Sequence, residues 1–119
     1  MDKIIVIDRV KASVLIKYDR SLEDLAIVLE NGLNIPTFWF KNDTDSPHEV
    51  TAMSECLGFE LWLHCVSTNP SYPFEIVFES TTVDLQREWT AELYDLSRWF
   101  SRFLSISCNL ETKHDYEKN

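Results

Sequence analysis

The chain has 119 residues, 45% of them hydrophobic, and a formal net charge of −9 at pH 7. This length and apolar content suit one domain with its own core and exclude a chain that is disordered throughout. The acidic balance argues against binding to DNA or RNA backbones, because such binding requires clustered Lys and Arg.

The N-terminal third predicts two strands, a helix and a third strand. Residues 3–9 and 12–18 are rich in Ile and Val and predict strands that form a hairpin about Val10–Lys11. Ser21 is a typical N-cap for a helix whose apolar residues recur at helical spacing, and Gly32 is expected to be the left-handed residue at its end. Residues 37–41 follow Pro36 and are aromatic enough for a strand.

The next segment contains signals for two different structures. Ser46, Pro47 and Glu49 have the pattern of a cap, a first helical proline and a capping-box glutamate, which predicts a short helix over 47–57 that Gly58 ends. A strand is the alternative, because small and apolar residues also alternate at Val50, Ala52, Ser54 and Cys56.

Residues 59–66 and 74–79 alternate between apolar and polar side chains and predict an antiparallel hairpin. Its apolar face would carry Phe59, Leu61, Leu63, Cys65, Phe74, Ile76 and Phe78. The opposite face would carry Glu60, Trp62, His64, Glu75, Val77 and Glu79.

The C-terminal third predicts a long helix over 84–104, because Leu and aromatic residues recur there at helical spacing. Ile106, Cys108 and Leu110 alternate as a short final strand. Residues 112–119 are polar and charged, so we expect a flexible tail after a single domain at 1–111. The whole pattern indicates an α+β fold: a mostly antiparallel sheet of about five or six strands, with two long helices and one short helix packed on it.

No pattern of catalytic or metal-binding residues is present. His64 and Cys65 are adjacent on a predicted strand and would therefore point to opposite faces. The three cysteines, Cys56, Cys65 and Cys108, form no C-x-x-C pair, and no His spacing matches a zinc site. Glu60, Glu75 and Glu79 could in principle act as acid and base in a small hydrolase, but a solvated sheet face explains them better. We therefore expect no enzyme, no cofactor and no metal.

The cysteine count and the N-terminal sequence also bear on location. An odd number of cysteines suits reduced, buried thiols rather than disulfides. The chain starts without the apolar stretch of a secretory signal, and no apolar run is long enough to cross a membrane. We expect a cytoplasmic protein without a membrane partner.

The negative charge is concentrated in the middle of the chain and predicts a binding surface there. Residues 42–86 contain no Lys or Arg but eight carboxylates. Such a block produces a field that attracts a cationic partner. Trp62 lies among these carboxylates, and Trp is enriched at binding hot spots. The predicted surface comprises Asp43, Asp45, Glu49, Glu55, Glu60, Trp62, His64, Glu75 and Glu79; the alternative is that Trp62 packs under a second layer.

Three segments make the chain resemble bacterial immunity proteins, including those of contact-dependent growth inhibition systems. They are 46–49 (Ser-Pro-His-Glu), 54–60 (Ser-Glu-Cys-Leu-Gly-Phe-Glu) and 95–104 (Asp-Leu-Ser-Arg-Trp-Phe-Ser-Arg-Phe-Leu). Immunity proteins are small, acidic, cytosolic inhibitors of a toxin. They share no universal motif, so the resemblance assigns no binding residue.

The resemblance implies that the acidic surface covers the active site of a basic toxin domain, often a nuclease. The partner would then be a protein, with no direct contact to nucleic acid, and we expect a monomer rather than a dimer. A small acidic secretion chaperone or adaptor module is the alternative, because such proteins have the same size, charge and location.

Overall fold

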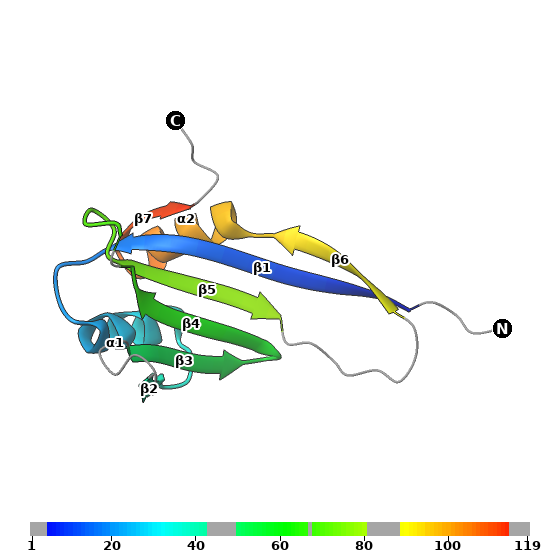
Figure 1. Ribbon diagram of the computed structural model, residues 1–119, viewed down its shortest axis with the longest axis horizontal. Helices are drawn as coiled ribbons and strands as arrows, with labels where there is room; N and C mark the ends of the chain where they lie inside the picture. Colours follow the sequence, from blue (N-terminus) through cyan, green and yellow to red (C-terminus); the bar gives the residue numbers. More distant parts are fainter. Residues whose placement is uncertain (1–4, 43–49, 67, 81–88, 115–119) are drawn as a thin grey trace.

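The computed structural model describes residues 5–42, 50–66, 68–80 and 89–114, and these form an α+β fold with two helices and one sheet (Figure 1). The elements in chain order are β1 (Ile5–Lys17), α1 (Leu22–Leu33), β2 (Trp39–Asn42), β3 (Val50–Cys56), β4 (Phe59–Cys65), β5 (Phe74–Ser80), β6 (Trp89–Asp95), α2 (Ser97–Ser107) and β7 (Glu111–His114). The strand order is β2-β3-β4-β5-β1-β6, and β7 also pairs with β1. The predicted class is confirmed.

The long strand β1 organises the sheet. On one edge, residues 11–16 pair antiparallel with β5. On the other edge, residues 5–11 pair parallel with β6 and residues 14–17 pair antiparallel with β7. The predicted hairpin at Val10–Lys11 is therefore wrong, because the chain continues straight through those residues. No Gly or Asn is present there to form a tight turn, and both halves of β1 find partners elsewhere (Figure 1).

Both helices pack on one face of the sheet and share a single core with it. Alternate residues of β1, Ala12, Val14 and Ile16, are fully buried against this layer. The helices contribute Leu25 and Leu29 from α1 and Phe100 and Leu104 from α2, among others. Burying a large apolar side chain stabilises the fold by roughly 1.5–3 kcal/mol, so each of the large side chains in this core contributes substantially.

The short helix over 47–57 is wrong, and the alternative strand is confirmed as β3. β3 pairs with β2 on one side and with β4 on the other. These two ladders satisfy its backbone groups and override the local helix signal. The cap residues 46–49 lie outside the described residues.

The long helix over 84–104 is also wrong. Trp89–Asp95 form β6 on the edge of β1, and the helix begins only at Ser97. Asp95 helps to set this start, because its Oδ1 accepts a hydrogen bond from the Ser97 amide at 2.8 Å. Leu85 and its neighbours lie outside the described residues.

The end of the chain differs from prediction too. Ile106 belongs to α2, so the final strand is not formed by 106–110 but by β7, at Glu111–His114. Three residues of the predicted tail, Thr112 to His114, are therefore in the sheet. Thr112 hydrogen-bonds both the hydroxyl and the carbonyl oxygen of Ser101 in α2, which holds this strand to the helix. Residues 115–119 lie outside the described part of the chain.

Helix α1 begins where the sequence predicts, because Ser21 Oγ accepts a hydrogen bond from the Asp24 amide at 3.1 Å. Its end is different. Asn34, with φ of 54°, is the left-handed residue, and Gly32 lies inside the helix. A methyl group at Gly32 would overlap Cys108 Sγ and lie 3.0 Å from the carbonyl oxygen of Ser107. Gly32 thus permits the close approach of α1 to the end of α2.

Gly32→Ala is expected to destabilise the protein by about 1–3 kcal/mol, because the overlap with Cys108 outweighs the better helix propensity of Ala. Urea denaturation measures the change. Asn31→Ala, at the exposed neighbouring position, is the control and should be neutral or stabilising. In the Cys108→Ala background the effect of Gly32→Ala should shrink. An equal loss in both backgrounds would contradict this contact.

The β3–β4 turn predicts a stabilising substitution. Leu57 and Gly58 both have positive φ, 52° and 81°, as a type I′ hairpin turn requires. Leu57 is 93% exposed, so its side chain contributes almost no burial. Leu57→Asn should raise the free energy of unfolding by about 1 kcal/mol, because Asn tolerates the left-handed region better than Leu. A thermal melt checks it. Leu57→Ala, which keeps the strain, should give little or no gain.

Candidate functional site

The face of the sheet opposite the helices carries most of the described residues of the predicted surface. Glu60, Trp62 and His64 on β4, and Glu75 and Glu79 on β5, alternate with the core residues Leu61, Leu63 and Ile76. No described helix covers this face, since α1 and α2 both contribute to the core on the other side. We call it the open face.

Three carboxylates form a row across the open face. Glu55 on β3 lies directly opposite Glu60 on β4, and Glu60 lies directly opposite Glu79 on β5. Neighbouring strands are about 4.8 Å apart, so like charges in this register repel and destabilise the sheet. Among the described residues, none of the three forms an ion pair. Lys11 on β1 lies directly opposite Glu79, but no ion pair joins these two described residues. The carboxylate row (Glu55, Glu60 and Glu79) therefore leaves its charge available to a partner, most of all at Glu55 and Glu60.

An apolar row runs beside these carboxylates, one step along the strands. Pairing in register places Trp39, Met53, Trp62 and Val77 side by side on β2, β3, β4 and β5. Trp39 is 53% exposed, and Trp62 is half-buried with its indole Nε1 donating to Glu60 Oε2 at 3.1 Å. This tryptophan row (Trp39, Met53, Trp62 and Val77) and the carboxylate row are thus linked by a hydrogen bond. Trp62 packs under no described second layer.

Glu75 has a different environment from the carboxylate row. Its Oε1 lies 2.8 Å from His64 Nε2, and its Oε2 accepts a hydrogen bond of 2.6 Å from Ser13 Oγ. The hydrogen bond from His64 lowers the pKa of Glu75, against the effect of its burial, and Ser13 and the charges of His64 and Lys11 add to the lowering. Glu75 is ionised, and both of its carboxylate oxygens already have partners. It therefore holds neighbouring side chains of the open face in place and leaves less negative charge for a binding partner.

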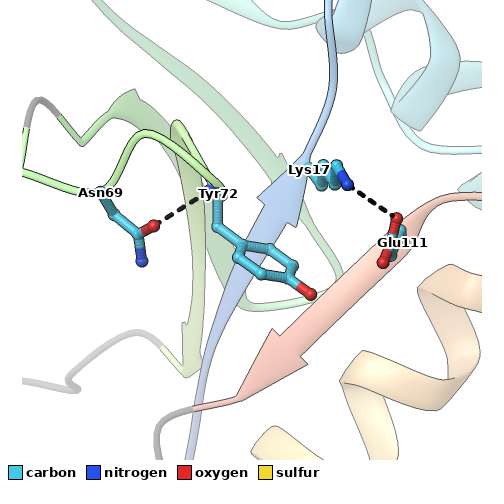
Figure 2. A network of polar contacts seen from close by, with 4 residues as sticks. All are labelled: Lys17, Asn69, Tyr72 and Glu111. Atoms are coloured by element: carbon cyan, nitrogen blue, oxygen red, sulfur yellow. Dashed lines mark hydrogen bonds and ion pairs between the residues drawn. The ribbon is translucent and has the colours of Figure 1, made fainter.

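Two hollows border the strands. One, of about 450 Å³, lies on the open face beside Glu75. It is lined by Ser13 of β1, Val77 of β5, and Leu93 and Asp95 of β6. The other, of about 640 Å³, lies at the end of the sheet near Tyr18, Pro73 and Leu110. Lys17 Nζ and Glu111 Oε2, 3.6 Å apart, form an exposed ion pair beside it, across β1 from the Asn69–Tyr72 turn (Figure 2). An exposed pair of this kind adds little stability.

The structure brings together six of the nine predicted site residues: Glu55, Glu60, Trp62, His64, Glu75 and Glu79. Glu55 was expected on a helix but lies on β3. Asp43, Asp45 and Glu49 lie outside the described residues. The sequence reasoning did not include Trp39, Met53 and Ser13, which share this face. The alternation in 50–56 would have placed Met53 there, whereas Trp39 and Ser13 required the strand register.

His64 and Cys65 do not form a nucleophile–base pair. His64 and Cys65 occupy opposite faces of β4, as predicted. Partial desolvation, with Glu23 nearby, raises the pKa of the Cys65 thiol and disfavours the reactive thiolate. Cys65 is exposed, however, so the expectation of a buried thiol is wrong for this residue. Within the described residues, no group of three or more His, Cys, Asp or Glu side chains is placed to hold a metal ion.

Comparison with known proteins does not assign a family. No protein-family model matches the chain, and no curated protein matches it. No helix among the described residues has both the length and the apolar character needed to span a membrane.

Replacing His64 by Ala should raise the pKa of Glu75, because it removes the strongest hydrogen bond to the ionised carboxylate. NMR titration of the Glu75 side-chain carbon measures the shift. Thr51→Ala, on the neighbouring strand opposite His64, is the control and should leave this pKa unchanged.

The same lowered pKa determines a pH dependence of stability. Ionised Glu75 contributes stability in full above the ordinary Glu pKa of about 4.3. This contribution declines below that pH and is gone once the pH falls through the lowered pKa of the folded state. Glu75→Gln should therefore flatten the acid side of the stability curve. An unchanged slope in the variant would contradict the assignment.

Proposed function

We propose that the open face binds a cationic protein, and that the chain is an immunity protein which neutralises a basic toxin domain. The observation that carries this proposal is the carboxylate row. Three like charges in register destabilise a free sheet, but a partner that inserts Lys or Arg side chains between them removes the repulsion. A cation at this row also has Trp62 beside it, and Trp is the best aromatic partner for a cation.

The same arrangement explains how binding would inhibit a toxin. A nuclease domain holds phosphates with Lys and Arg, and a row of carboxylates offers these residues an alternative anionic ligand. The tryptophan row provides apolar area for a hot spot next to the charges. The chain itself performs no reaction in this proposal, and it acts in the cytoplasm as a monomer without a cofactor.

A small secretion chaperone or adaptor is the second candidate, and the edge strand β2 favours it. β2 has four residues, pairs only with β3 among the described strands, and exposes Trp39 and Phe40. An extended client segment could add to such an edge. Light scattering separates the two functions. A monomer that binds a folded basic domain favours immunity, and a dimer that binds an unfolded peptide favours the chaperone.

Charge reversal on the open face is expected to slow association with the toxin. The probe is the C-terminal domain of the protein encoded immediately upstream, if that domain is basic. Glu60→Lys with Glu79→Lys should lower the association rate at low salt by at least about tenfold, and the difference should diminish as salt increases. Stopped-flow fluorescence at two ionic strengths measures both effects.

The matched control makes the same change in net charge elsewhere. Asp19→Lys with Glu92→Lys alters two exposed carboxylates away from the carboxylate row, and it should slow association much less. Equal slowing by both double variants would mean that only net charge matters. Binding and protection that survive Glu60→Lys with Glu79→Lys unchanged would reject this surface.

A further inference from the structure

Helix α2 exposes an apolar stripe on the side away from the core. Trp99 is 52% exposed, Phe103 39% and Ile106 84%. The spacing of four and then three residues places all three on one side of the helix, as in the seam of a coiled coil. We call Trp99, Phe103 and Ile106 the α2 outer stripe.

The outer stripe is not needed to hold α2 on the sheet. Phe100 and Leu104, on the inner side, are 3% and 0% exposed and already anchor the helix in the core. The stripe is nevertheless ordered, since the Trp99 ring lies 5.3 Å from Phe103 and 6.1 Å from Phe100, centroid to centroid. A rigid aromatic surface of this kind loses little side-chain entropy when a partner covers it.

The charges beside the stripe have the opposite sign to those of the open face. Arg98 and Arg102 are exposed, and their spacing of four residues lines one flank of the stripe. α2 contains no Asp or Glu, and neither arginine forms an ion pair with any described residue. Arg98 also lies in the first turn, where the helix dipole disfavours a cation. Both arginines therefore present positive charge beside the apolar stripe that no described residue neutralises with an ion pair.

We propose that the α2 outer stripe binds an amphipathic helix of a partner protein whose apolar seam is flanked by Asp or Glu. The helical spacing of the stripe matches a helical partner, and the two arginines match acidic flanking residues. A membrane or a nucleic acid is a poorer occupant, because an extended anionic surface repels a chain with a net charge of −9. The α2 helix of a second copy is poorer too, since it would bring arginines near arginines.

The interface is small. α2 has 11 residues, which corresponds to about 16 Å of helix. A contact of that length lies at the low end of interface sizes, so binding is expected to be weak and reversible. This site is separate from the open face, and its existence does not depend on the proposed toxin partner.

Two synthetic helices test the proposal on the full-length protein. Each has about 14 residues, or two heptads, with Leu in the seam. One carries Glu beside the seam, and the other carries Lys at the same positions. In ¹⁵N NMR titrations the Glu peptide should shift the amides of Ser97–Ser107, and the Lys peptide should not. If the Lys peptide shifts amides of β3–β5, it binds the open face and not the α2 outer stripe. The two surfaces are therefore read out separately, and either proposal can fail without the other.

Variants on the exposed surface should keep the fold and locate the site. Arg98→Glu with Arg102→Glu should weaken binding of the Glu peptide at least about tenfold, and Trp99→Ser should do the same through lost apolar contact. Ile27→Ser, at a position 54% exposed on α1, is the matched control and should not change it. The proposal is overturned if α2 amides do not shift, or if the arginine variant binds as well as the wild type.

Discussion

Strand β1 is the element on which the rest of the structure depends, because among the described strands it alone is hydrogen-bonded to three others. Its alternation sends Ala12, Val14 and Ile16 into the core and Lys11 and Ser13 to the open face. The neighbouring strands follow the same pleat as β1. A residue that pairs with Lys11 or Ser13 therefore has its side chain on the open face as well. One covering layer of helices then leaves the other side of the sheet without a described partner.

This arrangement produces two surfaces of opposite charge. The carboxylate row lies on the open face, while Arg98 and Arg102 lie on the outer side of the helical layer. Each surface includes a charge arrangement that is unfavourable for the isolated fold: like charges in register in one, and a cation near a helix N-terminus in the other. Each also has exposed tryptophan nearby, Trp39 in the first and Trp99 in the second.

Local signals in the sequence predicted the structure correctly where an element is determined by its own residues or by those of the adjacent element. Ser21 starts α1, and the alternation of 59–66 and 74–79 correctly assigned the two faces of the β4–β5 hairpin. Those signals failed where a segment also carried a helical pattern and strand pairing decided the structure. Val50–Cys56 and Trp89–Asp95 contain helical patterns, yet β4 and β1 provide hydrogen-bond ladders that a helix would have forfeited.

The sequence by itself determined the α+β class, the acidic central segment and the residues of the hairpin that share a face, because these follow from composition and from a period of two. Only the tertiary structure decided that Glu55, Glu60 and Glu79 stand in one row, that Trp39 and Met53 lie beside Trp62, and that Trp99 faces outward. The physical reason is that strand register and helix docking depend on how one segment pairs or packs with another, which the periodicity of a single segment does not encode.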